Sequence, residues 1–220
     1  MKKAEKRHNI LIMQNIIIHG KPVIICDQIT ERIQARITNE HLIQMHEPDL
    51  KNIESLLHAL QDNAVYGYVW LSHQPEAVFK SLISHFEHWQ AAGGLIVNYR
   101  DQVLLMFRRG KWDLPKGKME PDETPEITAR REVTEETGLH NLHIESKLSD
   151  TWHAYHQFGK DIMKQTHWFK MQFTGTELTV PQIEEDILDI QWIKPENISK
   201  YLQYSYPNLK TVFESAGYKI

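Results

Sequence analysis

Three glutamates lie within five residues of one another near the middle of the chain, next to an arginine and between two glycines, and this pattern constrains the fold more than any other. The fixed residues are, in order, Gly117, Glu123, Arg131, Glu132, Glu135, Glu136 and Gly138, with aliphatic residues at Val133 and Leu139. Each fixed position has a background frequency of roughly 5 to 10%, so a chance match at every one is improbable. The segment therefore favours a functional site over an exposed acidic face.

The segment is predicted to form a short helix with defined ends. Thr124 can cap the start, and Pro125 suits the first helical position because the N–H that proline lacks has no partner there. Gly138 can adopt the left-handed conformation that ends a helix. Ala129 and Val133, four residues apart, form a small apolar stripe that can pack against the rest of the fold.

The three glutamates of this helix share a different face. Glu132, Glu135 and Glu136 have the spacing i, i+3 and i+4, so their like charges repel unless a cation neutralises them. Mg²⁺ is the expected cation because it prefers hard oxygen ligands. Arg131 can pair with Glu123 or support one of the ligand carboxylates. The remaining alternatives are an exposed acidic face and a folded site without catalysis.

The pattern resembles the signature segment of the Nudix hydrolases, and the resemblance covers roughly residues 92–210. It implies an α/β fold of Nudix type, an α/β/α sandwich with a mixed β-sheet, over residues 92–220. It also implies hydrolysis of a nucleoside diphosphate linked to another moiety, with Mg²⁺ as cofactor and Mn²⁺ as a substitute. By the resemblance, Glu135 and Glu136 are the leading metal ligands, followed by Glu132 and the carbonyl of Gly117, whereas Glu123 supports Arg131 or a water molecule.

Members of this family often supply another acidic residue from outside the signature segment. The candidates here are Glu184, Glu185 and Asp186, just before a predicted strand that ends near Trp192. Asp186 aligns best and Glu185 nearly as well. Either one can bind a further metal or act as the general base, and an exposed acidic loop is the alternative.

Several cationic residues flank the predicted metal site and can hold phosphate oxygens. They are Lys116, Lys118, Arg108 and Arg109, with Lys116 preferred. Residues 152–156, which include His153, and residues 160–164 could form a substrate loop with aromatic surfaces and cations. The run from Trp112 to Gly117 is similar to that of family members acting on dinucleoside polyphosphates or diphosphoinositol polyphosphates, and a dinucleoside polyphosphate is favoured.

Residues 1–91 are expected to form a small α/β unit, separated from the rest by the Ala-Ala-Gly-Gly segment at 91–94. Its role stays open between self-association into a homodimer, closure over the substrate and binding of another protein. Predicted strands are 16–18, 23–26, 65–71, 95–99, 103–107, 142–148, 166–173 and 187–193, and predicted helices are 48–60, 75–89 and 207–216.

Composition excludes several classes of protein. The net charge of −4 and the isoelectric point near 6.3 argue against a general nucleic-acid or membrane binder. Residues 1–18 have a basic start and an apolar stretch, but Gln14 and Asn15 interrupt that stretch and no small-residue cleavage site follows. The single cysteine, Cys26, cannot form an internal disulfide, so a cytoplasmic location is expected.

Three functions are compatible with the sequence. The leading one is a Mg²⁺-dependent pyrophosphohydrolase. The second is a non-catalytic module that senses nucleotides and transmits binding through residues 1–91. The third is a diphosphate isomerase of the same fold, which fits less well because such enzymes use a cysteine and Cys26 lies far from the signature segment.

Overall fold

The computed structural model describes residues 13–220, so the basic start and residues 10–12 of the apolar stretch lie outside the described residues. The chain divides into two compact units. Unit 1 comprises residues 1–87, as far as they are described, and Ala154–Asp161; unit 2 comprises His88–His153 and Ile162–Ile220. Within residues 13–220, no helix is long and apolar enough to cross a membrane.

Unit 1 is a small α/β unit, as the sequence predicts. Its strands are β1 (Met13–Ile18), β2 (Lys21–Cys26), β3 (Ile43–His46) and β4 (Tyr68–Leu71), and its helices are α1 (Glu31–Asn39), α2 (Ile53–Ala59) and α3 (Pro75–Ile83), with a 3-10 turn η1 (Leu50–Asn52) before α2. The strand order is β1-β2-β4-β3. β1 and β2 form the predicted antiparallel hairpin, whereas β4 runs parallel to both β2 and β3.

The core of unit 1 explains why α1 forms where the sequence analysis predicted no helix. Thr30 caps α1, since its hydroxyl accepts a hydrogen bond from the N–H of Ile33 at 3.3 Å. Ile33 then packs with Ile24, Cys26 and Val69 of the sheet in one apolar cluster. Cys26 is fully buried there, as its apolar character suggests.

Unit 2 contains the longer strands. They are β5 (Glu87–Val97), β6 (Val103–Arg108), β7 (Lys111–Asp113), β8 (Lys116–Lys118), β9 (Leu142–Lys147), β10 (Thr151–Gln157), β11 (Lys160–Phe173) and β12 (Ile187–Ile193). Its helices are α4 (Pro125–Thr137), α5 (Ile198–Leu202) and α6 (Leu209–Ser215), with 3-10 turns η2 (Ile183–Glu185) and η3 (Pro195–Asn197). The strand order is β12-β6-β5-β11-β10, with β7 on β6, β8 on β5 and β9 on β11. The parts of β10 and β11 next to their turn, Ala154–Asp161, belong to unit 1.

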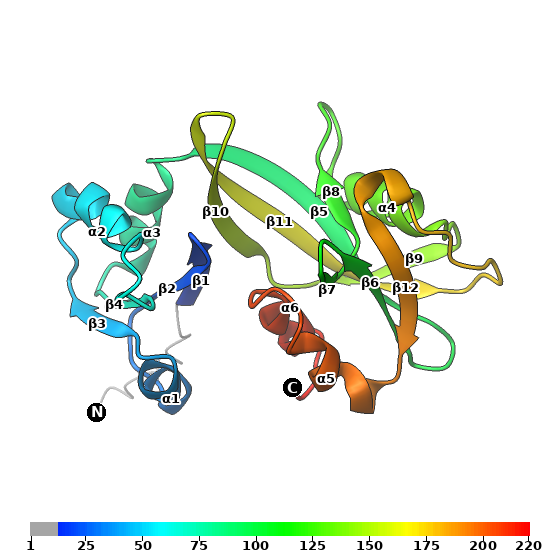
Figure 1. Ribbon diagram of the computed structural model, residues 1–220, viewed down its shortest axis with the longest axis horizontal. Coiled ribbons are helices and arrows are strands. Elements are labelled where there is room, and N and C mark those ends of the chain that lie inside the picture. The colour runs from blue at the N-terminus through cyan, green and yellow to red at the C-terminus, as the bar shows by residue number, and fades with distance from the viewer. Residues whose placement is uncertain (1–12) are drawn as a thin grey trace, which may run out of the picture. The chain divides into compact units, whose positions relative to one another are not determined.

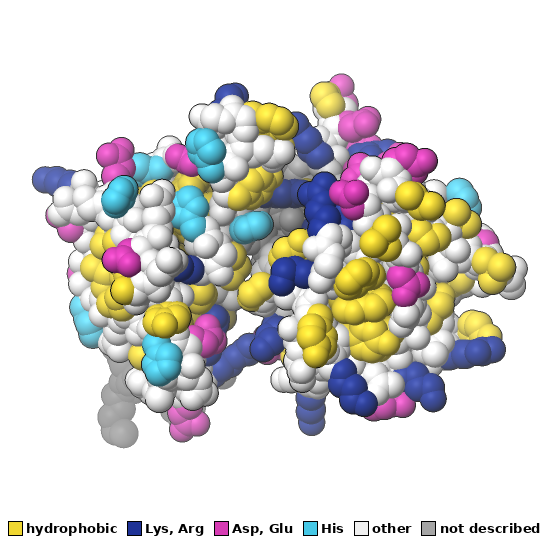
Figure 2. All heavy atoms as spheres, in the orientation of Figure 1, with side chains coloured by type: hydrophobic (Ala, Val, Ile, Leu, Met, Phe, Trp, Pro, Cys, Tyr) yellow, Lys and Arg dark blue, Asp and Glu magenta, His cyan; other side chains and the backbone are white. Residues whose placement is uncertain are grey.

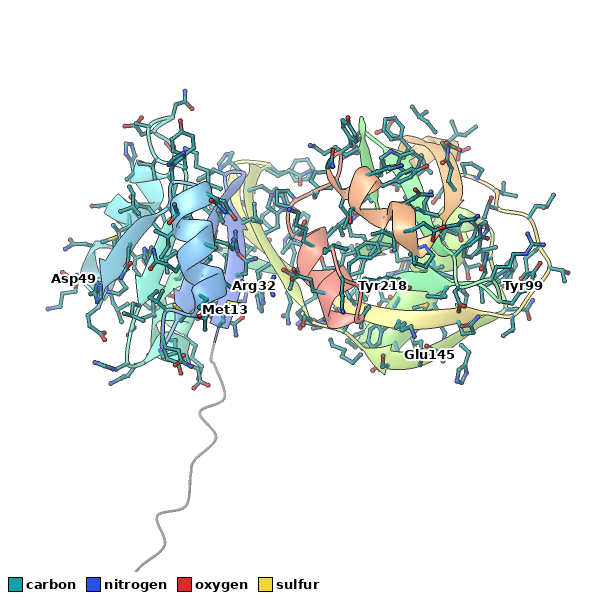
Figure 3. The ribbon with its side chains drawn as sticks, turned by 90° about the horizontal axis from the view of Figure 1, so that it is seen from below. Met13, Arg32, Asp49, Tyr99, Glu145 and Tyr218 are labelled. Carbon is teal, nitrogen blue, oxygen red and sulfur yellow. The ribbon has the colours of Figure 1, made fainter. Side chains whose placement is uncertain are left out.

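Helices cover both faces of the unit 2 sheet, so the expected α/β/α sandwich is confirmed (Figure 1). Side chains alternate along β5: Leu95 packs with α5 and α6, and Ile96 packs with α4. Phe213 of α6 is buried in the core on the α5 and α6 side of the sheet. The centre of its ring lies 5.6 Å from the centre of the Tyr218 ring. Figure 3 shows Tyr218 beside these helices and Tyr99 at the outer turn after β5.

Two predictions of local structure were wrong. The helix expected over 75–89 ends at Ile83, and Trp89 lies in β5, because the strand pairing of β5 continues back to Glu87. Residues 152–156 and 160–164, expected to form a substrate loop, lie instead in the hairpin of β10 and β11, which turns at Phe158 and Gly159, both with positive φ. The Ala-Ala-Gly-Gly segment lies inside β5, where a Cβ at Gly93 would collide with the backbone of Pro115.

Candidate active site

The site lies in unit 2 where α4 faces β8. As predicted, α4 begins at Pro125, its N-cap Thr124 accepts a hydrogen bond from the N–H of Ile127, and it ends at Gly138 with a φ of 75°. Ala129 and Val133 are fully buried in the core on the α4 side of the sheet. This packing fixes the rotation of the helix, and therefore the direction of its glutamates. Figure 2 shows Lys and Arg side chains beside Asp and Glu side chains in the region of α4 and β8.

The three glutamates differ in their exposure to solvent. The side chain of Glu136 is 3% exposed and that of Glu132 is 13% exposed, whereas that of Glu135 is 48% exposed. Burial raises the pKa of Glu136 to about 7, although the nearby Lys116 opposes the increase. Burial also raises the pKa of Glu132, against the effect of Arg131. Two carboxyl groups are thus held where their ionised forms are poorly solvated.

Gly117 lies directly against Glu132. A Cβ at this position would collide with the carboxylate of Glu132. Any larger residue at this position would push the carboxylate of Glu132 aside, so glycine allows Glu132 to keep its place.

Arg131 organises the acidic residues of the signature segment. Its guanidinium forms two 2.8 Å hydrogen bonds with Glu123, one of 2.7 Å with Glu132 and one of 3.0 Å with Glu135. The carbonyl of Lys118 accepts a further bond at 3.0 Å. Both arrangements considered from the sequence, pairing with Glu123 and support of the neighbouring carboxylates, are present together.

Glu123 lies in the loop before α4 and is held by donors of that loop and of the start of α4 as well as by Arg131. It accepts hydrogen bonds from Arg131, from the hydroxyl of Thr128 at 2.6 Å and from the N–H of Glu120 at 3.1 Å. These bonds, those from Arg131 above all, lower the pKa of Glu123 to about 2. The ionised Glu123 therefore stabilises the positions of Arg131 and of the loop before α4.

Glu136 is held from two sides. One oxygen accepts a hydrogen bond from the backbone N–H of Lys116 at 2.7 Å, and the other pairs with Arg108 at 3.2 Å. Arg108 also pairs with Glu185 at 2.6 Å. A single guanidinium from the end of β6 therefore links α4 to the acidic loop before β12.

The acidic loop reaches the site through consecutive arginines. Arg108 holds Glu185, and Arg109 pairs with Asp186 at 3.1 Å, with both of the latter side chains 64% exposed. Glu184 is exposed on the same loop. Of the three acidic candidates, Glu185 is the one that shares a cation with Glu136, whereas Asp186, which aligned best in sequence, faces the exposed Arg109.

The other predicted cations take different positions. The ammonium of Lys116 pairs with Asp113 at 2.7 Å, and its pKa is raised because Asp113 and Glu136 outweigh the effect of burial. The ammonium of Lys118 lies 4.2 Å from the ring centre of Trp89. His153 is brought to the site, where burial and then the charges of Lys164 and Lys116 lower its pKa.

Sequence reasoning did not single out Asp113, and it included Lys164 only as the last residue of a possible substrate loop over 160–164. Asp113 is 3% exposed and its carboxylate accepts hydrogen bonds from Lys116 and from the N–H of Leu114. The signal for Asp113 was an aspartate three residues before a lysine in an otherwise apolar run. The sequence analysis expected Lys164 in a loop, whereas it lies in β11, where successive side chains point to opposite faces of the sheet.

The residues of the site fit a divalent metal in their chemistry. The ionised carboxylates of Glu132 and Glu136 are poorly solvated, and a bound hard dication would stabilise their negative charge. Glu135 adds an accessible oxygen donor on the same helix, and the backbone of Gly117 lies in contact with Glu132. As placed, no three acidic, histidine or cysteine side chains of residues 13–220 converge on one point, because each glutamate is engaged by an arginine or by backbone N–H.

Comparison with known proteins gives matches to unit 2. The model of the NUDIX domain matches residues 87–213. A protein of Mycobacterium tuberculosis named MutT4 is 33% identical over 129 residues, which are 54% of this chain and 51% of that protein. The chain thus spans about half the length of this relative.

Two further matches come from other organisms. An RNA pyrophosphohydrolase of Erythrobacter litoralis is 24% identical over 132 residues, 51% of this chain and 80% of that protein. The crystal structure of a MutT protein from Methanosarcina mazei is 22% identical, covers 59% of this chain and 92% of its own, and gives a TM-score of 0.47.

Proposed function

The chain belongs to the NUDIX domain family, and on this premise we propose that it is a Mg²⁺-dependent pyrophosphohydrolase acting on a nucleoside diphosphate linked to another moiety. Among such substrates we favour a dinucleoside polyphosphate, on the similarity of the run from Trp112 to Gly117. Residues 92–220 carry the hydrolase in this proposal. Residues 1–91 carry a separate function, with self-association into a homodimer as one candidate.

One observation carries the proposal most directly. Glu136 is almost completely buried, its pKa is raised by that burial, and Glu132 and Glu135 lie on the same helical face. A buried carboxylate without full compensation is costly for a fold, so its presence calls for a function. Binding of a dication next to a phosphate chain is the function that suits these oxygen donors.

Each part of the site then has a defined role. Glu132, Glu135 and Glu136 hold Mg²⁺, for which Mn²⁺ can substitute, with the carbonyl of Gly117 as a further ligand. When bound, the ion neutralises charge on the diphosphate and lowers the pKa of water. Arg131 orients Glu132 and Glu135, because it bonds to both while Glu123 holds it in place.

The cations on the other side of the site bind the substrate. Lys116 and Arg108 donate to phosphate oxygens, and Arg109, Lys118 and His153 extend this surface. Because the pKa of His153 is lowered, its imidazole is neutral at pH 7 and can donate or accept a hydrogen bond without adding charge.

A general base must take a proton from the attacking water. Glu185 is the preferred candidate, since Arg108 holds it next to the position of Glu136. Asp186 is the second candidate. The kinetics of Glu185→Gln and Asp186→Asn separate the two candidates. The variant that has lost the general base should show a large decrease in kcat and little change in KM.

The sensing module is the second candidate function. It is favoured by the way the protein's own cations already engage each carboxylate, an arrangement that a nucleotide could rearrange without being hydrolysed. The isomerase is not supported in the same way, because the single cysteine of the chain is buried in the core of unit 1. We further place the reaction in the cytoplasm, since Cys26 is a free thiol.

A substrate panel tests the proposal. It comprises dinucleoside polyphosphates, nucleotide sugars, ADP-ribose, oxidised nucleoside triphosphates, 5′-triphosphate RNA and diphosphoinositols, each assayed with Mg²⁺ and with Mn²⁺ by identifying both products of cleavage. Glu135→Gln and Glu136→Gln should lose nearly all turnover while staying folded. Glu126→Gln, an exposed position on the same helix, is the matched control and should keep wild-type rates. Tight binding of a nucleotide without its hydrolysis would favour the sensing module instead.

A further inference from the structure

Asp113, at the end of β7, forms an almost buried ion pair with Lys116, at the start of β8. The side chain of Asp113 is 4% exposed and that of Lys116 is 19% exposed, and the ammonium lies 2.7 Å from Oδ2 of Asp113. The other carboxylate oxygen accepts a hydrogen bond from the N–H of Leu114 at 2.9 Å. Apolar residues of similar volume often replace buried ion pairs without loss of stability, so folding alone does not account for this pair.

The backbone on both sides of the pair is fixed by the sheet. Asp113 lies opposite Met106 of β6, and Lys116 lies opposite Gly93 of β5. A Cβ at Gly93 would collide with the Cβ of Lys116, so the lysine side chain begins in the space that this glycine leaves. The carboxylate and the ammonium therefore meet across a short bend whose two ends belong to different strand pairs.

Lys116 also binds Glu136, but through its backbone. The N–H of Lys116 donates to Oε2 of Glu136 at 2.7 Å, and Oε1 of Glu136 pairs with Arg108 at 3.2 Å. The flexible four-carbon stem of Lys116 thus begins beside a buried carboxylate. Burial lowers the pKa of Lys116, but the charges of Asp113 and Glu136 outweigh it, so the ammonium is within electrostatic reach of both.

A carboxylate accepts a limited number of partners. Its two oxygens offer about four lone-pair positions, and in Glu136 the N–H of Lys116 and the guanidinium of Arg108 use two of them. A dication needs one of the remaining positions, and an ammonium of Lys116 released from Asp113 would compete for it. Held by Asp113, the ammonium keeps two of its three N–H donors for phosphate oxygens.

We propose that Asp113 is a positioning residue, which holds the ammonium of Lys116 away from Glu136 and so leaves that carboxylate accessible to the metal ion. The inference rests on the proposed function, because it takes Glu136 to be a metal ligand. It assigns Asp113 no contact with metal or substrate, since the two carboxylate oxygens of Asp113 are engaged by Lys116 and by the N–H of Leu114.

Calorimetric titration with Mn²⁺ alone, without nucleotide, tests the inference. Asp113→Asn removes the charge that holds Lys116 and keeps the shape of the side chain. It should bind Mn²⁺ about ten- to a hundredfold more weakly than the wild type, because a charge-assisted hydrogen bond from Lys116 to Glu136 must then be broken. The double variant Asp113→Asn with Lys116→Met has no competing ammonium and should bind Mn²⁺ as tightly as the wild type. A double variant as weak as Asp113→Asn would show that Asp113 acts only on the fold.

A matched control is available in the same unit. Asp150 pairs with Lys147, which is also three residues away and also at 2.7 Å, and it contacts Gln165 and His167. Asp150→Asn makes the same chemical change in that setting and should leave the Mn²⁺ affinity as in the wild type. Asp113→Ser removes the same charge as Asp113→Asn with a smaller side chain and should weaken binding in the same way, so the comparison does not depend on one variant folding.

A crystal structure of metal-free Asp113→Asn separates direct competition from the loss of a charge at a distance. The ammonium of Lys116 should lie within hydrogen-bond distance of the carboxylate of Glu136. An ammonium that stays beside residue 113, or equal Mn²⁺ affinity in Asp113→Asn and the wild type, would overturn the inference and leave the hydrolase proposal intact. No uptake of Mn²⁺ by the wild type would contradict the proposed function, and the inference with it.

Discussion

Arg131 and Glu123 form a two-point ion pair, in which Nε and Nη2 of the arginine each lie 2.8 Å from a carboxylate oxygen. The same guanidinium bonds to Glu132 and Glu135, so the position of two proposed metal ligands depends on a residue eight positions before Arg131. This pair connects the loop before α4 to the chemistry of the site.

Glu123→Gln is expected to lower kcat/KM about 10- to 100-fold, as is typical when the partner that orients a ligand is lost. The pKa of Glu123 is lowered to about 2 from 4.5, so the stability it contributes is present above pH 4.5 and is lost as the pH falls towards 2. The melting temperatures of the wild type and the variant should therefore differ at pH 7 and converge near pH 2. Equal melting temperatures at both pH values would contradict this role.

Glu136 is expected to have the opposite effect on stability. Its pKa is raised from 4.5 to about 7, so the folded protein holds the proton more tightly than the unfolded chain does. Without metal, this residue should lower stability as the pH rises from 4.5 to 7, by on the order of 3 kcal/mol in all. Denaturant unfolding in EDTA measures the effect as the difference between the wild type and Glu136→Gln.

That difference is needed because other groups titrate in the same range. His153, whose pKa is lowered, makes stability rise with pH up to its ordinary value of 6.5, but it is present in both proteins and its contribution cancels. A stability difference between wild type and Glu136→Gln that stays constant from pH 5 to 8 would show that the pKa of Glu136 is not raised by folding.

The helix at the site could be predicted almost to the residue. Its cap at Thr124, its start at Pro125 and its end at Gly138 depend on local backbone preferences, and its apolar stripe of Ala129 and Val133 on spacing alone. Such signals are contained in a few consecutive residues. The chemical roles given to the glutamates remain predictions.

The position of Lys164 could not be predicted in this way. Its place depends on β11 continuing back to Lys160 as half of a hairpin with β10, and the polar residues at 152–165 gave no clear strand signal. The pairing of Arg108 with both Glu136 and Glu185 joins residues 28 and 77 positions apart. Only tertiary structure sets contacts of this range.

Gly117→Ala is expected to displace the carboxylate of Glu132, because the added Cβ would occupy its place. Turnover should fall at least tenfold, with little change in the melting temperature. Gly175→Ala is a matched control, since its Cβ would also meet a glutamate side chain, that of Glu177, but on an exposed loop outside the site. Wild-type turnover in Gly117→Ala would show that the position of Glu132 is unimportant for the reaction.

Cys26→Ala is expected to leave turnover unchanged and to lower stability by about 1 kcal/mol. Cys26 is fully buried in the core of unit 1, and the loss of its sulfur leaves a small cavity there. Steady-state kinetics and denaturant unfolding of the same preparation check both parts. A large loss of turnover in a folded variant would instead favour thiol chemistry, and with it the isomerase.

Calorimetric titration with Mg²⁺ and with Mn²⁺, in the absence and presence of nucleotide, tests the central claim most directly. The wild type and the control Glu126→Gln should show the same saturable uptake of metal, and Glu136→Gln should bind at least tenfold more weakly. No uptake by the wild type under any of these conditions, or equal uptake by all three proteins, would contradict a metal site built from the glutamates of α4.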